Sequence, residues 1–215
     1  MNFTLYNYVL SGNCYKIRLM ASLLGVEYET VAVDFYPGFE HRSDTMLAVN
    51  PAGTLPVLQA GDLVLTETGA MLTWLAQKYD PAWLPSDAEG LAAVVEWLGF
   101  ANRLTQSAGA ARLHDMLGWP VDGEAAKSAA LRDLRALEMS LTDRVIDGKL
   151  WLVGDRPSIA DIACFPYVAL SPDAGLEHDP YPAIRNWLYG IRALPGFITL
   201  PGVHYLHELN EAASA

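Results

Sequence analysis

The sequence predicts an α/β module followed by an all-helical module, with the boundary near residue 80. Residues 1–80 alternate short β-branched or apolar stretches with helical spacing, in the order strand, helix, strand, loop, hairpin and helix. Residues 91–215 show only the helical spacing of apolar side chains. Between them, residues 81–90 carry two prolines and end in a glycine, which indicates a linker between two domains.

The elements of the first module follow from local patterns. Cys14, Ile17 and Ala21 fall on one helix face, and Gly25 stands where that helix would stop. Ala60-Gly61-Asp62 has the composition of a hairpin turn between two short strands. The expected strands are residues 2–6, 28–33, 56–59 and 63–66, and the expected helices are residues 14–24 and 67–79.

The second module is expected to contain four helices, at residues 91–104, 123–147, 158–170 and 181–193. Ser158 and Asp161 are a hydroxyl and an acid three residues apart at the start of the third of these helices. That spacing is typical of a capping box, so we assign the pair to folding rather than to catalysis.

Composition excludes several classes of protein. The 215 residues are 52% hydrophobic and 18% charged, which is too apolar for a disordered chain. The net charge of -11 disfavours nucleic acid and anionic membranes as partners. The apolar stretch 162–170 is too short for a membrane span, and the first residues lack a secretory pattern. Cys14 and Cys164 form no disulfide framework, so we expect a cytoplasmic protein. His204 and His207 have zinc-like spacing without accompanying ligands, and no metal is expected.

The first candidate site is Ser11-Gly12-Asn13-Cys14, between the first strand and the first helix. The free amides of a helix N-terminus favour an anion such as a thiolate, to which a hydroxyl can also donate. The alternative is that Ser11 or Asn13 only caps the helix.

The second candidate is the run NPAGTLPVL at residues 50–58, in which Pro56 opens a strand. An X-Pro bond can be cis, and a cis Leu55–Pro56 bond would turn the backbone of Leu55 outward. An extended peptide could then pair with it as an added strand. The alternative is an ordinary trans proline at a sheet edge.

The third candidate is Thr66-Glu67-Thr68-Gly69, where a strand ends and a helix begins. Free amides and a hydroxyl there would bind a carboxylate, and Glu67 would pair with an ammonium. Simple capping of the helix by threonine is the alternative.

Together these motifs resemble a known family. The segments YNYVLSGNCYKIRLMASLLGVEYE, NPAGTLPVL, ETGAMLTWLAQKY, WLVGDRPSIADIACFPYVAL and YPAIRNWLYGIRALPGF are similar to those of bacterial glutathione S-transferases of the serine-type, theta-like branch. The resemblance covers nearly the whole chain. It implies a thioredoxin-like N-terminal domain, an all-helical C-terminal domain, glutathione as co-substrate on the first domain, and a homodimer.

The resemblance also implies roles for individual residues. Ser11 matches the hydroxyl that stabilises the thiolate, with Asn13 as the second candidate donor. Leu55 with Pro56 matches the pair that binds the cysteinyl part of glutathione. Glu67 with Thr68 matches the pair that holds its γ-glutamyl end.

Other positions depart from the family or belong to the second substrate. Thr54 stands where the family commonly has a lysine or glutamine that reaches the glycyl carboxylate, and His41 or Arg42 would have to compensate. Tyr8 is interpreted as a pocket wall. The wall for the electrophile is expected at Trp97, Phe100 and Arg112, although helix core is the default for the two aromatics and a surface ion pair for the arginine.

The resemblance implies conjugation of the glutathione thiolate to an apolar electrophile. A thiol of pKa about 8.5 is only about 3% ionised at pH 7, and lowering that pKa by two units requires about 2.7 kcal/mol. A hydrogen bond from Ser11, about 1.5 to 3 kcal/mol, and the helix N-terminus, about 0.3 to 2 kcal/mol, are sufficient. The alternatives are a non-catalytic glutathione-binding protein and a glutathione-dependent disulfide or peroxide reductase. Cys14 is expected to be a buried structural thiol, and no cysteine stands at position 11 to support the reductase.

Overall fold

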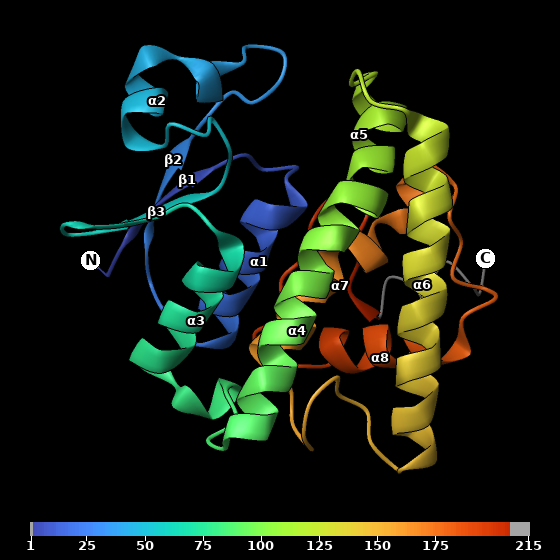
Figure 1. Ribbon diagram of the computed structural model, residues 1–215. Helices are drawn as coiled ribbons and strands as arrows, with labels where there is room; N and C mark the ends of the chain where they lie inside the picture. The colour runs from blue at the N-terminus through green and yellow to red at the C-terminus, as the bar shows by residue number, and fades with distance from the viewer. Residues whose placement is uncertain (1, 207–215) are drawn as a thin grey trace.

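The computed structural model describes residues 2–206, and its first part is built on a four-stranded sheet in the order β2-β1-β3-β4 (Figure 1). The strands are β1 (Thr4–Asn7), β2 (Glu29–Ala32), β3 (Val57–Ala60) and β4 (Leu63–Leu65). β1 pairs in parallel with β2 and antiparallel with β3, and β3 pairs antiparallel with β4. Because parallel neighbours need a crossover, helix α1 (Gly12–Leu23) connects β1 to β2.

Two helices of this first part carry its core. α1 and α3 (Thr68–Tyr79) pack against each other, and α7 (Ile159–Ala169) packs against both. Figure 1 shows α2 (Asp44–Val49) on the side of the strands away from α1 and α3. The buried side chains of both halves form one continuous cluster, so the sheet is anchored on the helical half through α1 and α3.

The second part is helical apart from an isolated bridge between Leu200 and Val203, as far as residues 2–206 are concerned. Its helices are α4 (Ala88–Leu104), α5 (Ala110–Leu117), α6 (Gly123–Ile146), α7 and α8 (Pro182–Arg192). A π-helical turn, η3 (Thr105–Gly109), joins α4 to α5. Short 3-10 turns occur at η1 (Glu40–Arg42), η2 (Pro81–Trp83) and η4 (Ser171–Ala174). Within the described range no helix is long and apolar enough to cross a membrane.

This architecture confirms the predicted fold class, and the expected strands and helices lie within a few residues of the observed ones. The sequence did not predict α2, η3 or α5. The segment from Thr105 onward is rich in small and polar residues, so the apolar spacing of the preceding helix stops there and predicts no further helix. In the structure those small residues allow close packing, since a Cβ on Gly109 would lie 2.9 Å from the ring of Tyr167 on α7. η2 and the first residues of α4 lie within the segment 81–90.

Candidate functional site

A cavity of about 300 Å³ lies between the two halves of the chain, at the edge of the sheet where β1 ends and β3 begins. β4 ends at the same edge because it runs antiparallel to β3. Extending the register in which Leu58 faces Leu65 places Pro56 opposite Glu67. The topology therefore brings the three motifs singled out in the sequence to one side of the sheet. The residues that line the cavity are Tyr8, Leu10, Ser11, Gly12, Asn13, Phe35, His41, Arg42, Gly53, Thr54, Leu55, Thr105, Gly109, Arg112, Leu113, Met116, Leu117, Trp119 and Tyr167.

Ser11 caps helix α1 and faces the cavity. Its Oγ accepts a hydrogen bond from the backbone amide of Cys14 at 3.2 Å, and its carbonyl accepts from the amide of Tyr15 at 2.9 Å. Capping uses the hydroxyl oxygen as an acceptor and leaves the hydroxyl hydrogen for a second partner, and the buried Cys14 sulfur lies within reach of it. The same side chain can therefore cap the helix and donate to an anion in the cavity.

Asn13 lies two residues further along the same helix N-terminus and also lines the cavity. Its Oδ1 is 3.4 Å from the Thr105 hydroxyl, which comes from η3. The ring of Tyr167 fills the space beneath this helix N-terminus, because a Cβ on Gly12 would lie 2.9 Å from it. Glycine at position 12 is therefore required by a close approach of α7 to α1.

The loop before β3 is held by a buried asparagine. The Nδ2 of Asn50 donates to the carbonyl and the hydroxyl of Thr54 at 2.9 and 3.0 Å, and its Oδ1 accepts from the amide of Ala52 at 3.1 Å. The Leu55–Pro56 bond is cis, as the sequence motif suggested, and a second cis bond occurs at Tyr36–Pro37. Leu55 lines the cavity while Pro56 is buried behind it.

The positively charged Arg42 lines the cavity beside Gly53, together with His41. A Cβ on Gly53 would lie 3.4 Å from the carbonyl oxygen of His41 and 3.6 Å from Cγ of Arg42, so this corner is close-packed. His41 is buried, and its Nδ1 has no partner among the described residues. The pKa of His41 is lowered, mainly by burial and to a lesser extent by the neighbouring Arg42 guanidinium. His41 is therefore neutral at pH 7, and the charge at this corner is that of Arg42.

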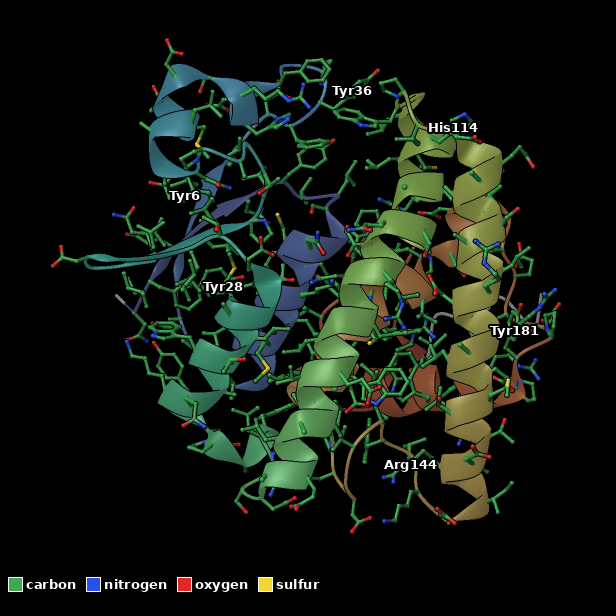
Figure 2. All side chains as sticks on the ribbon, in the orientation of Figure 1. Tyr6, Tyr28, Tyr36, His114, Arg144 and Tyr181 are labelled. Atoms are coloured by element: carbon green, nitrogen blue, oxygen red, sulfur yellow. The ribbon has the colours of Figure 1, made fainter. Side chains whose placement is uncertain are left out.

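An aromatic cluster spans the opening between the halves. Phe35 stacks on Trp119 with ring centroids 5.2 Å apart and on His41 at 4.3 Å, and Tyr8 lies 5.5 Å from Phe35. Figure 2 shows the loop that carries Tyr36 facing the end of α5 that carries His114. The predicted wall residue Tyr8 is part of this cluster.

Sequence reasoning missed most of the wall on the helical side. The missed residues on that side are Thr105, Gly109, Leu113, Met116, Leu117, Trp119 and Tyr167, and Phe35 was missed on the side of the sheet. Most of them lie on η3 and α5 or directly after α5, elements that the apolar spacing did not reveal. Alanine-rich spacing from Ala108 to Leu117 is the only sequence signal for that helix, and it is weak.

Arg112 lies in the cavity wall as a buried ion pair, not as the surface pair that was the default expectation. Its Nε donates to Oδ2 of Asp173 at 2.7 Å, and its Nη1 donates to the carbonyl of Leu10 at 3.1 Å. The guanidinium thereby ties α5 to the loop after β1 and to η4.

Five of the predicted site residues lie outside this lining: the buried Pro56, and Glu67, Thr68, Trp97 and Phe100. Glu67 is exposed at the N-cap of α3, and Thr68 is buried in the first turn of that helix. Trp97 and Phe100 line a second cavity of about 230 Å³, together with side chains of α4 and α6. The structure therefore does not bring Trp97 and Phe100 to the first cavity, because the two side chains face α6 across the second cavity instead.

Both cysteines are free and buried. The Cys14 sulfur accepts a hydrogen bond from the amide of Tyr8 at 3.4 Å, and burial raises the pKa of its thiol. Cys14 therefore has the environment of a structural thiol. No cluster of three or more His, Cys, Asp or Glu side chains suited to a metal occurs between residues 2 and 206, and His207 lies outside the described residues.

A mixed four-stranded sheet with a helix N-terminus and a cis-proline at one edge, docked on a helical half, defines the class of glutathione S-transferase folds. Two family models match the chain: "Glutathione S-transferase, N-terminal domain" over residues 5–83 and "Glutathione S-transferase, C-terminal domain" over residues 120–188. The chain belongs to the glutathione S-transferase family.

Individual relatives agree with this assignment. The chain is 30% identical over 205 residues to human glutathione S-transferase theta-1, which covers 91% of this chain and 85% of the relative. It is 32% identical over 204 residues to a maleylpyruvate isomerase of a Ralstonia species, covering 84% of this chain and 88% of the relative. A crystal structure of a glutathione S-transferase from Xanthobacter autotrophicus superposes with a TM-score of 0.81 at 30% identity, covering 96% and 99% of the two chains.

Proposed function

We propose that this protein binds glutathione in the cavity beside α1, stabilises its thiolate with the Ser11 hydroxyl, and transfers it to an apolar electrophile. The observation that carries the proposal is the position of Ser11, which lines the cavity at the N-terminus of α1 while its hydroxyl oxygen caps that helix. The thiolate attacks an electrophilic carbon, a C–S bond forms, and the leaving group departs with the bonding electron pair. Ser11 donates to the sulfur and does not itself attack.

The edge of the sheet supplies a place for each part of glutathione. Leu55, before the cis bond, offers its backbone to the cysteinyl part as an added strand would. Glu67 and Thr68 lie at the same edge and would hold the γ-glutamyl end. Because the Thr54 side chain is short and is held in the loop by Asn50, we assign the glycyl carboxylate chiefly to the longer, charged Arg42.

The electrophile would lie against the helical side of the cavity. Leu113, Met116 and Trp119 provide an apolar wall there, and Arg112 lies in the same wall already bonded to Asp173. This assignment replaces Trp97 and Phe100, which line the other cavity.

The ultraviolet absorbance of the thiolate of bound glutathione, followed against pH, tests the catalytic proposal. In the wild type we expect a pKa well below that of the free thiol, and in Ser11→Ala we expect it to rise by one to two units, since one charge-assisted hydrogen bond is lost. Asn13→Ala is the comparison variant, with a smaller expected rise.

The outcomes separate the competing functions. A thiol pKa that does not change on binding would overturn thiolate stabilisation and leave a glutathione-binding protein. A pKa that stays low in Ser11→Ala and rises in Asn13→Ala would transfer the role to Asn13. Turnover with halogenated aromatics but not with peroxides supports conjugation, and the reverse result supports the reductase.

We further propose that the protein is a homodimer through the exposed face of α4. Leu91 and Val95 are 44% and 60% exposed one turn apart on this helix, and Gly99, one turn further, has open space where a Cβ would be. Such a stripe lets two copies of one helix approach closely about a twofold axis. Exposed apolar groups of this kind are stabilised by burial against an identical surface.

Sedimentation of Val95→Glu tests this interface. We expect the variant to dissociate to monomers at concentrations where the wild type is dimeric, because a carboxylate would face its own copy across the axis. Met139→Glu is the matched control, since Met139 is 70% exposed on α6. Equal behaviour of the two variants would exclude the α4 face.

A further inference from the structure

Lys16 on α1 is a fully buried lysine without a carboxylate partner among residues 2–206. Its Nζ is 3.5 Å from the hydroxyl of Thr105 and 5.2 Å from the ring centroid of Tyr167. The other titratable group beside it is the Cys164 thiol on α7. Burial lowers the pKa of Lys16 to about 8, so it is mainly protonated at pH 7. An unpaired buried ammonium is costly, and the proposed mechanism so far gives it no role.

The ammonium lies directly behind the cavity wall. Thr105, whose hydroxyl accepts from the ammonium, and Tyr167, whose ring lies beside it, both line the cavity. Asn13 stands three residues before Lys16, so the two side chains share one face of α1. The side chains of Thr105 and Tyr167 therefore lie between the ammonium and the cavity.

The Thr105 hydroxyl connects Lys16 to Asn13. Its oxygen accepts from Lys16, and its hydrogen lies within reach of two acceptors, the carbonyl of Ala101 at 3.0 Å and Oδ1 of Asn13 at 3.4 Å. A carboxamide can present either its oxygen or its NH2 group to such a hydroxyl. A positive charge on that side favours the oxygen, and the NH2 group of Asn13 then faces the cavity as a donor.

We propose that Lys16 is a positioning residue, whose charge, acting through Thr105, orients the Asn13 amide so that its NH2 group points at the glutathione sulfur. This inference rests on the proposed function. The same charge also adds positive potential at the sulfur, in a protein whose net charge of -11 would otherwise disfavour an anion. The donor set at the sulfur is then the Ser11 hydroxyl and the Asn13 amide, and only the second depends on Lys16.

Titration of the bound thiol in four variants tests the proposal. Lys16→Met keeps an unbranched side chain one atom shorter and removes the charge, and Thr105→Val keeps the shape and removes the hydroxyl. We expect each to raise the pKa of bound glutathione by about one unit, a tenfold smaller thiolate fraction below that pKa. Thr105→Ser should restore the wild-type value, because it retains the hydroxyl. Cys164→Ala is the packing control beside Lys16, with no expected change.

The combination with Asn13→Ala gives the sharpest readout. If Lys16 acts through Asn13, the rise in thiol pKa in the double variant Lys16→Met with Asn13→Ala will be smaller than the sum of the two single rises. A purely structural role of Lys16 would change the melting temperature or the affinity for glutathione without moving the thiol pKa.

Three results would count against the inference in distinct ways. An unchanged thiol pKa in Lys16→Met, with the wild-type shift intact and lost in Ser11→Ala, overturns it while the proposed function stands. A rise in Lys16→Met but none in Thr105→Val overturns the connection through Thr105. A wild-type protein that binds glutathione without any shift refutes the proposed function itself.

Discussion

Replacing Asp161 by alanine is expected to lower the free energy of unfolding by about 4 kcal/mol. The carboxylate is completely buried and accepts four hydrogen bonds. Its Oδ1 accepts from the Leu152 amide at 3.0 Å and the Trp187 indole at 2.9 Å. Its Oδ2 accepts from the Ser158 amide at 2.9 Å and the Ser158 hydroxyl at 3.1 Å. Alanine would leave these donors buried without an acceptor, and each such group costs about 1 to 3 kcal/mol.

Urea unfolding followed by circular dichroism measures this loss. Asp122→Ala is the matched control, because Asp122 caps α6 at the surface and, within residues 2–206, accepts only from the Ala125 amide at 3.0 Å. Loss of a single exposed cap costs about 1 kcal/mol. If the two variants lose equal stability, Asp161 acts as a cap alone and the contacts to Leu152 and Trp187 contribute nothing.

The Asp161 network shows what local sequence can and cannot reveal. Ser158 and Asp161 are three residues apart, so their capping box is visible in the sequence and is confirmed. Leu152 and Trp187 reach the same carboxylate from a loop and from another helix. Nothing in the spacing along the chain predicts those two contacts, because they depend on how α7 and α8 pack.

The candidate site divides in the same way. Ser11 and Leu55 could be located from sequence because each follows from a local rule, a cap at a helix start and a proline at a strand start. The wall on the helical side could not, since Phe35 meets Trp119 only after the two halves dock. The apolar spacing of α4 pointed to Trp97, but periodicity does not say which neighbouring helix a face packs against.

Lys16 is the residue for which sequence reasoning was most incomplete. Lysine is almost never fully buried unless it is paired, so its position on α1 carried no expectation of burial. Its neighbours on α7, Cys164 and Tyr167, are neutral, because burial raises the pKa of both. Thr105 on η3 does not titrate. The free-energy cost of burying this charge can therefore be measured from the pH dependence of stability that the titration of Lys16 causes.

Lys16→Met is expected to be more stable than the wild type by about 3 kcal/mol at pH 7, with the advantage disappearing above pH 10.5. Burial lowers the pKa of Lys16 from 10.5 to about 8 in the folded protein. Below pH 8 the folded and unfolded chains both carry the proton, and the folded chain bears the whole penalty. Between pH 8 and 10.5 only the unfolded chain retains the proton, so wild-type stability rises with pH. Above pH 10.5 both are neutral and the penalty is gone.

Urea unfolding of the wild type and Lys16→Met at pH 7, 9 and 10.5 measures the difference in their free energies of unfolding. Groups other than Lys16 titrate in both proteins, so their contributions cancel in this difference. Lys78→Met, on the exposed side of α3, is the control and should show no such dependence. An advantage of Lys16→Met that is constant with pH would mean that methionine only packs better than lysine. A stability advantage of Lys16→Met that declines between pH 8 and 10.5, together with a raised pKa of the bound glutathione thiol in this variant, would mean that the Lys16 charge destabilises the fold but favours the thiolate in the site.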